Sequence, residues 1–349
     1  MDQQVGNGSL CFSKAPFIIS TASVVGPKEG EGPLKDYFDV IGSDDKFGEV
    51  NWEAAESALQ KEALTLTLGK IKRKATDVRY LFAGDLLGQT IASSFGLKDF
   101  EIPLFGLYGA CSTCGESLSL ASMTVAAGYA DCVAAVTSSH FASAEKQFRF
   151  PLEYANQRPM SATWTVTGSG GFLVATEEKA KEFQARPMAQ ITGITTGKIV
   201  DFGIKDSMNM GAAMAPAACD LINQHFKDFN REPKDYDCIV TGDLGVVGQE
   251  ILIELLKDKG YDISEVHEDC GIKIFDAKKQ NTGAGGSGCG CSAVTFSGYY
   301  LRQLKEGRIK RMLLVPTGAL LSTVSFNEGQ SVPGIAHGIV VEGVSSWIM

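Results

Sequence analysis

The sequence has few cysteines, no long apolar run and no excess of basic residues, and each deficit excludes a class of protein. Nine cysteines among 349 residues are too few for a disulfide scaffold, and their number is odd. The first ten residues, MDQQVGNGSL, contain neither the basic segment nor the apolar core of a secretory signal. We therefore expect a reducing compartment and no signal peptide.

Long apolar segments are also missing, because no run approaches the roughly 20 residues of a membrane span. The nearest run, residues 312–326, is interrupted by Pro316 and Gly318. The net charge of −9 argues against nucleic acid or anionic lipid as a broad electrostatic partner. With 44% hydrophobic and 21% charged residues, the composition is typical of a soluble globular protein, for which any membrane association would be peripheral.

What the sequence does contain is an internal repeat. The segments DVRYLFAGDL (77–86) and DYDCIVTGDL (235–244) align without a gap, each with a leading Asp, an apolar strand pattern and a closing Gly-Asp-Leu. Each is followed by a small-residue turn, a helical pattern and a second apolar strand. Gly128 and Gly307 are placed to end the two helices as C-cap glycines. The pattern predicts two similar α/β units.

A cysteine stands at the turn before the first of these helices. The stretch GACSTCGES (109–117) puts Cys111 between small residues, and alignment of the glycines in the two units places Cys111 opposite Gly290. We therefore divide the chain into duplicated halves, residues 1–187 and 188–349, that form one compact unit.

A duplicated α/β chain with such a cysteine resembles the thiolase-like fold. GACST is similar to the nucleophile turn of that superfamily, TVTGSGGFLVA (165–175) to its glycine-rich strand, and TGALLS (317–322) to its late glycine-rich loop. The resemblance implies an α/β fold in which two duplicated halves stack mixed sheets around buried helices. A homodimer is expected by analogy with that fold alone.

Further motifs resemble one family within this superfamily, stage V sporulation protein AD. They are, in chain order, GPKEGEGPL, NWEAAE, AGDLLGQ, TSSHFASAEKQFRFP, GAAMAPAA, TGDLG, GGSGCGCSA and IAHG. The resemblance implies a part in moving dipicolinic acid (pyridine-2,6-dicarboxylate) into the spore, beside membrane proteins of the same sporulation complex. It implies a location in the forespore or spore, soluble or attached peripherally to the inner spore membrane.

Condensing enzymes of the superfamily need two polar side chains beside the cysteine, to stabilise the enolate and the oxyanion. When the motifs of the ketoacyl-synthase III branch are aligned with this sequence, their catalytic His falls on Gly242 and their catalytic Asn on Gly290. Both side chains are therefore replaced, and we expect a former enzyme pocket that is used for binding, with no catalytic residues.

A planar dianion calls for guanidinium groups, other donors and a helix N-terminus. Arg149 is the first candidate, with Lys146 and Arg158 behind it, and His140 is a donor when protonated. His337, near the C-terminal strand, is a second histidine expected to face the site. The predicted ligand-binding residues are Cys111, His140, Arg149, Asp85, Asp243 and His337.

Asp85 and Asp243 follow the two repeated strands, and two roles are open for their side chains. Their carboxylates can cap the helices that follow, or they can lie near the pocket, where calcium would have to bridge them to a dianion. We therefore consider two forms of the ligand, free dipicolinate and its calcium chelate. No acidic loop of the sequence, however, supplies the six to eight oxygen ligands of a calcium site in the protein. No cofactor and no protein-bound metal are expected.

The cysteine pairs Cys111/Cys114 and Cys289/Cys291 supply four thiols, yet their spacing favours small-residue packing over zinc or redox chemistry. Two other functions stay open at this point. One is an acyl-transferring enzyme that uses Cys111 and an unrecognised histidine. The other is a scaffold that docks a membrane channel and whose pocket is vestigial.

Overall fold

The structure is a computed structural model that describes residues 3–148, 157–344 and 347. Its strands are β1 (Gln4–Val5), β2 (Ser9–Cys11), β3 (Phe17–Val25), β4 (Val40–Ile41), β5 (Leu81–Gly84), β6 (Leu104–Leu107), β7 (Cys132–Ser139), β8 (Trp164–Thr165), β9 (Gly168–Ala175), β10 (Ala189–Thr196), β11 (Cys238–Thr241), β12 (His267–Asp269), β13 (Gly286–Ser287), β14 (Arg311–Val315), β15 (Thr317–Ala319) and β16 (Gly334–Glu342). Its helices are α1 (Pro27–Gly30), α2 (Trp52–Gly69), α3 (Ile91–Leu97), α4 (Thr113–Ala126), α5 (Phe141–Phe148), α6 (Glu177–Glu182), α7 (Met210–Phe229), α8 (Gly245–Lys257), α9 (Cys270–Ile274), α10 (Ala277–Gln280), α11 (Cys289–Thr295), α12 (Leu301–Lys305) and α13 (Thr323–Asn327).

The strand order is the same in both halves. The first half runs β3-β9-β7-β5-β6 and the second runs β10-β16-β14-β11-β12. In each, the first two pairings are antiparallel and the last two are parallel. A short antiparallel contact between β10 and β3 joins the two sheets. The duplicated α/β fold predicted from the repeated Gly-Asp-Leu strands is thereby confirmed.

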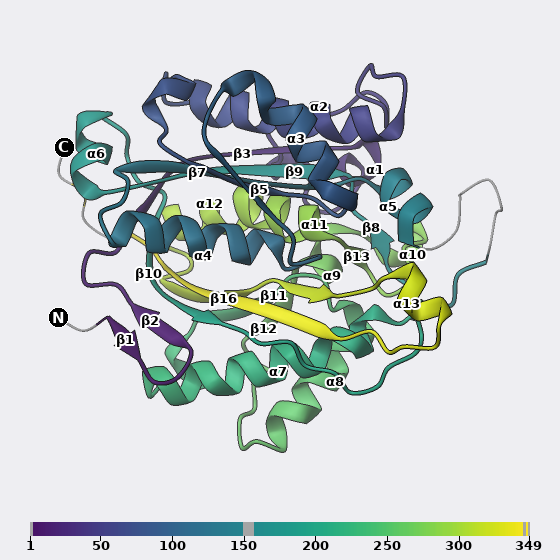
Figure 1. Cartoon of the computed structure of the whole chain (residues 1–349). Helices are drawn as coiled ribbons and strands as arrows, with labels where there is room; N and C mark the ends of the chain where they lie inside the picture. Colours follow the sequence, from purple (N-terminus) through teal and green to yellow (C-terminus); the bar gives the residue numbers. More distant parts are fainter. Residues whose placement is uncertain (1–2, 149–156, 345–346, 348–349) are drawn as a thin grey trace.

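The elements stack in five layers, as Figure 1 shows. Helices α2 and α3 cover the outer face of the first sheet, and α7 and α8 cover the outer face of the second. Helices α4, α11 and α12 lie between the sheets. No helix within the described ranges is both long and apolar enough to cross a membrane.

Local sequence explains where the helices begin and end. The Asn51 side chain accepts a hydrogen bond from the Ala54 N–H (2.8 Å), so it caps α2. Gly128 and Gly307, which follow the helices α4 and α12, have φ values of 78° and 74°. This left-handed conformation is the one that makes glycine the usual residue after a helix end, and both C-cap predictions are confirmed.

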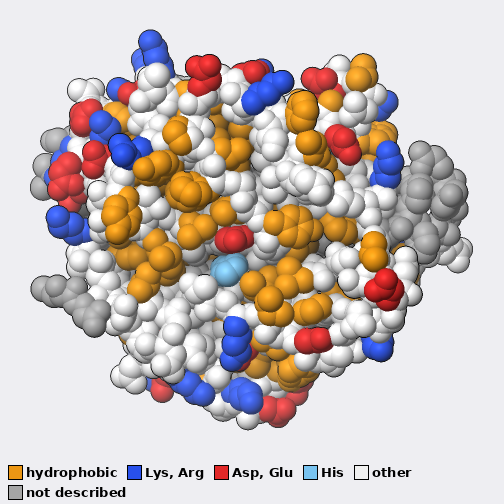
Figure 2. All heavy atoms as spheres, in the orientation of Figure 1, with side chains coloured by type: hydrophobic (Ala, Val, Ile, Leu, Met, Phe, Trp, Pro, Cys, Tyr) orange, Lys and Arg blue, Asp and Glu red, His pale blue; other side chains and the backbone are white. Residues whose placement is uncertain are grey.

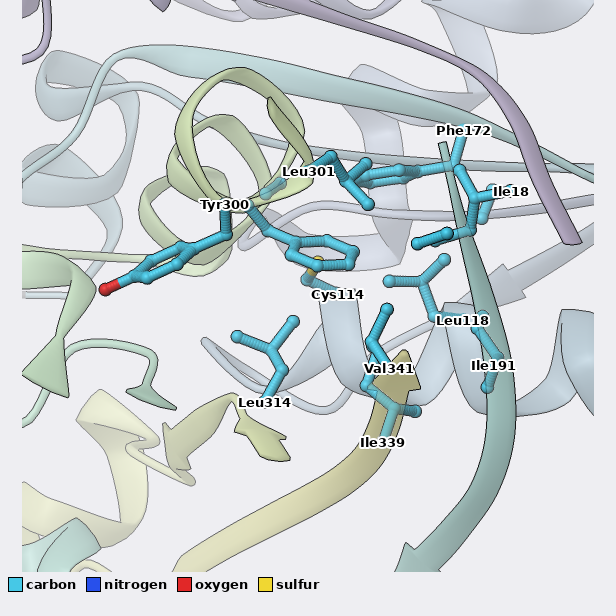
Figure 3. Packing of buried hydrophobic residues seen from close by; sticks show 14 of the residues in the cluster. Ile18, Cys114, Leu118, Phe172, Ile191, Tyr300, Leu301, Leu314, Ile339 and Val341 are labelled. Carbon is cyan, nitrogen blue, oxygen red and sulfur yellow. The ribbon is translucent and has the colours of Figure 1, made fainter. Parts of the chain in front are cut away.

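The main hydrophobic core lies between the two sheets. Figure 3 shows Cys114 and Leu118 of α4 among side chains from both halves. Phe172 of β9 and Ile339 of β16 belong to the same cluster, and all four side chains are fully buried. Cys114 is therefore a core residue, and burial raises the pKa of its thiol to about 12.

The two halves make a close contact where α11 lies on the first sheet. A Cβ atom on Gly290 would lie 2.5 Å from the carbonyl oxygen of Gly168 and 2.8 Å from the backbone nitrogen of Ser139. The Gly290 N–H donates to the Ser139 hydroxyl (3.1 Å), which in turn donates to the Val166 carbonyl (2.7 Å). Only glycine allows this approach, because the backbone atoms on the other side cannot move aside.

This contact makes Gly290→Ala a severe substitution. We expect it to lower the free energy of unfolding by about 3 kcal/mol through overpacking against backbone, as measured by chemical denaturation. Gly69→Ala is the matched control, since nothing lies within 4 Å of the added Cβ there, and it should be neutral or stabilising. Equal stabilities of the two variants would contradict the packing argument.

The Cys111 pocket and its surroundings

Cys111 sits in a tight turn between β6 and α4. The turn is closed by the Thr113 hydroxyl, which donates to the Ala110 carbonyl (2.6 Å) and accepts from the Gly109 N–H (3.0 Å). Ala110 has φ = 50°, a strained value for a residue with a Cβ. The cysteine is 6% exposed, so the predicted strand–cysteine–helix arrangement is present but nearly closed to solvent.

A carboxylate from the second half lies against this cysteine. Asp243 is fully buried and accepts hydrogen bonds from the Cys111 side chain, the Gly288 N–H (2.8 Å) and the Thr317 hydroxyl (2.9 Å). Burial raises the pKa of Asp243 to about 7, against the opposing effect of these donors. A carboxylate beside a sulfur disfavours the thiolate that a nucleophilic cysteine requires.

The sequence predicts that catalytic side chains are replaced at Gly242 and Gly290, and neighbouring atoms fill the space beside both glycines. A Cβ on Gly242 would lie 3.0 Å from Cα of Pro316 and 3.1 Å from the backbone nitrogen of Thr317. The Gly242 carbonyl accepts from the Cys291 thiol (3.5 Å). At neither position is there space for a His or Asn side chain without a shift of the backbone.

The interpretation that the repeat aspartates cap the helices that follow them agrees with the structure for Asp85 but not for Asp243. Asp85 accepts from the N–H of Leu87 and from the N–H and hydroxyl of Ser93, in the first turn of α3 (2.8, 2.8 and 2.6 Å). Asp243 binds the N–H of Gly288, the residue before α11, rather than the helix next in sequence. Asp243 lies instead beside Cys111, as the second interpretation expects.

Sequence reasoning missed a buried polar network beneath the pocket. Glu56 accepts from the hydroxyls of Ser138 (2.9 Å) and Ser143 (2.8 Å), and Gln60 donates to those of Ser138 (2.8 Å) and Ser93 (2.9 Å). Burial, then the nearby charge of Asp85, raises the pKa of Glu56 to about 8. A signal was available, because Glu56 and Gln60 are four residues apart on the face of α2 that is otherwise apolar.

Neither His140 nor His337, the two histidines predicted to face the site, offers a protonated ring to Cys111. His140 is fully buried: its Nε2 lies 2.7 Å from the Asp45 carbonyl, and its Nδ1 accepts from the Ala142 N–H (3.1 Å). Burial lowers the pKa of His140 to about 4 and that of His337 to about 4. Both rings are therefore neutral at pH 7. The predicted role of His140 as a protonated donor does not fit these contacts.

The basic candidates are dispersed. Arg149 lies outside the described residues, and Lys146 is exposed on α5. Arg158 approaches Glu145 (3.3 Å) and stacks over the ring of Trp164, 4.7 Å from its centroid. It lines a different cavity from that of Cys111.

The Cys111 pocket is small and mainly apolar. Its volume is about 30 Å3, enough for one or two water molecules. Two hydroxyls, of Thr165 and Ser287, contribute to its wall. The other lining side chains include Leu86, Tyr108, Cys111, Phe148, Met210 and Leu321.

The second pair of cysteines is engaged with backbone. Cys289 donates its thiol hydrogen to the Ser138 carbonyl (2.9 Å), and Cys291 to that of Gly242. Burial raises the pKa of both thiols well above the usual range. In residues 3–148, 157–344 and 347, no group of three or more His, Cys, Asp or Glu side chains is arranged to hold a metal ion.

Comparison with known proteins gives two kinds of match. The family model described as "Stage V sporulation protein AD (SpoVAD)" matches residues 6–342. A protein of Bacillus subtilis (strain 168) named "Stage V sporulation protein AD" is 43% identical over 337 residues, which are 97% of each chain.

Solved structures of condensing enzymes share the fold at low identity. The 3-oxoacyl-[acyl-carrier-protein] synthase III of Aquifex aeolicus superposes with a TM-score of 0.56 at 11% identity, over 94% of this chain and 99% of that one. A human mitochondrial 3-ketoacyl-CoA thiolase, in complex with CoA, gives 0.58 at 12% identity, over 96% and 99%. These likenesses confirm the thiolase-like fold.

The raised pKa of Glu56 predicts a pH-dependent stability. Between pH 5 and 8 the unfolded chain has this group ionised while the folded chain keeps it protonated, so the free energy of unfolding falls as pH rises. Glu56→Gln should reduce that fall by roughly 1–3 kcal/mol in chemical denaturation at pH 5, 6, 7 and 8.

The control is Glu62→Gln, an exposed residue of the same helix with the same change of charge. It should leave the pH dependence as in the unmodified protein. Parallel stability curves for Glu56→Gln and the unmodified protein would show that Glu56 is ionised in the fold.

Proposed function

The chain belongs to the stage V sporulation protein AD family, and on this basis we propose that it binds dipicolinic acid as a non-condensing component of the spore uptake machinery. The observation that carries the proposal is the composition of the Cys111 pocket. A buried carboxylate lies against Cys111, and Gly242 and Gly290, on which the catalytic His and Asn are expected to fall, are packed tightly against backbone. The pocket is thus suited to binding rather than to acyl transfer.

The walls of the pocket match the parts of the ligand. The apolar side chains of Leu86, Phe148 and Leu321 suit the faces of a pyridine ring, and the hydroxyls of Thr165 and Ser287 can donate to its carboxylates. A ring of this size needs more room than about 30 Å3, so binding requires rotation of side chains at the mouth. Protonated Asp243 would lessen repulsion of the dianion.

Arg149 remains the sequence candidate for the cationic partner, because it directly follows Phe148, which lines the pocket. Calcium can accompany the ligand as its chelate, with Asp85 and Asp243 as the nearest predicted carboxylates. Within a sporulation protein, this binding activity would serve delivery to membrane proteins of the same complex at the inner spore membrane.

Calorimetric titration with dipicolinate, with and without calcium, tests the proposal. We expect saturable binding that pyridine-2-carboxylate does not reproduce, at least tenfold weaker binding in Arg149→Ala, and a smaller loss in Cys111→Ala. Lys146→Ala, an exposed cation three residues earlier, is the matched control and should bind normally.

Two results would favour the other functions. Acylation of Cys111 by a thioester reagent, lost in Cys111→Ala, would identify an acyl-transferring enzyme. Absence of dipicolinate binding at millimolar concentration, together with capture of a membrane channel protein of the sporulation complex, would identify a scaffold.

The edge of the first sheet supports the proposed homodimer. Strand β6 is the last strand of that sheet, and Leu104 and Phe105 on it are 42% and 52% exposed. Residues 104–108 carry no charge or proline of the kind that protects a free edge. Figure 2 shows hydrophobic side chains gathered over the middle of the face on which α4 lies.

We propose that two copies pair through β6. Light scattering at micromolar concentration should then give twice the chain mass, and Leu104→Lys should shift it toward the monomer. Tyr129→Lys, an exposed aromatic outside the strand, is the control. A monomeric mass for the unmodified protein would refute the pairing.

A further inference from the structure

A second cavity, here called the outer cleft, lies beside the Cys111 pocket and is much larger. Its volume is about 570 Å3, within the range of small-molecule sites. It is lined by Arg158, Met160, Thr163, Trp164, Thr282 and Gly283, among others. No sequence motif pointed to these residues as a group.

The two-stranded ribbon of β8 and β13 separates the two cavities. Trp164 pairs with Gly286, and Thr165 pairs with Ser287. Successive residues of a strand point to opposite faces, and accordingly Trp164 lines the outer cleft whereas Thr165 and Ser287 line the Cys111 pocket. Figure 1 shows β8 and β13 close to α5 and α10.

Two cations hold the indole of Trp164 in place. The Nζ of Lys28 lies 4.6 Å from the ring centroid, and the guanidinium carbon of Arg158 lies 4.7 Å from it. Lys28 also donates to the Gln280 carbonyl (2.8 Å), and Arg158 approaches Glu145 (3.3 Å). The wall of the cleft therefore combines an aromatic plane with the guanidinium of Arg158, which is paired with Glu145.

Three polar atoms of the lining residues are buried and have no hydrogen-bond partner. They are Oγ1 of Thr163, Nε1 of Trp164 and Oγ1 of Thr282. Thr163 and Thr282 are each only 2% exposed. An unpaired buried polar group is destabilising, so three of them in residues that line one cavity call for an explanation.

The chemistry of these groups defines the missing partner. The indole N–H can only donate, and a hydroxyl can donate as well as accept, so each of the three groups can donate to an acceptor. The guanidinium of Arg158 favours an acceptor with negative charge. A planar anion would also stack with the indole and guanidinium planes.

We propose that the outer cleft is a second binding station, which takes the carboxylate of a planar aromatic acid on the far side of the β8–β13 ribbon from Cys111. The identity of that acid as dipicolinate rests on the proposed function. The outer cleft has the room that the Cys111 pocket lacks, so the ligand is received there first and reaches Cys111 after side chains at the ribbon move.

Tryptophan fluorescence of the full chain tests this station. In Trp52→Phe/Trp347→Phe, Trp164 is the only tryptophan left. Dipicolinate should change its emission with saturation, and pyridine-2-carboxylate, which retains one carboxylate, should do so more weakly. Arg158→Gln in this background should weaken the response at least tenfold. Arg73→Gln, a cation over the distant Phe183 ring, is the matched control.

Thr282→Val separates binding from folding. It removes an unpaired hydroxyl without changing the side-chain shape, so the melting temperature of the free protein should stay the same or rise. Dipicolinate binding measured by Trp164 should nevertheless weaken several-fold. Unchanged affinity in both Thr282→Val and Arg158→Gln would overturn the proposal.

Cys111→Leu, which fills the inner pocket, distinguishes this proposal from the proposed function. A Trp164 response that survives Cys111→Leu supports an independent outer station. Calorimetric binding that depends on Arg149 but leaves Trp164 emission unchanged would retain the proposed function and refute the outer station. A saturable Trp164 response to CoA but not to dipicolinate would also refute it.

Discussion

The contact between α11 and the backbone of the first sheet is the constraint on which the rest of the structure depends. Gly290 lies against Gly168 and Ser139 at distances that no side chain allows, and Gly170 lies as closely on Ala293. This approach places Gly288 near the Cys111 turn, and the Gly288 N–H donates to the Asp243 carboxylate there. The same contact leaves no space for a side chain at position 290.

Burial of carboxyl groups dominates the electrostatics around the pocket. Glu56, Asp85 and Asp243 are all buried, and each has a pKa raised by the loss of solvent. Hydroxyls and backbone N–H groups satisfy them without a basic side chain in direct contact among the described residues. With pKa values of about 8 and about 7, Glu56 and Asp243 hold protons near neutral pH.

The fold is thiolase-like, and the Cys111 turn within it is nearly closed to solvent. A larger cavity lies on the other face of the two-stranded ribbon of β8 and β13. A thin wall thus separates the two proposed ligand sites. The exposed β6 edge lies outside both cavities, so the proposed self-association and the proposed ligand binding use different parts of the chain.

The sequence alone determined the duplicated fold, the helix ends and the family, because these follow from local patterns: the repeated Gly-Asp-Leu strands, Asn51 before an apolar helix, and glycines after helix ends. It also located Cys111 at its turn and indicated that Asp243 lies near the site. The tertiary structure alone decided that Asp243 hydrogen bonds to Cys111, that His140 is neutral, and that Glu56 and Gln60 form a buried network. It alone also brought residues 157–164 beside residues 281–283 to form the outer cleft. These features depend on contacts between segments far apart in the chain, and burial, which sets the pKa of each group, is a property of the packed molecule that no local pattern encodes.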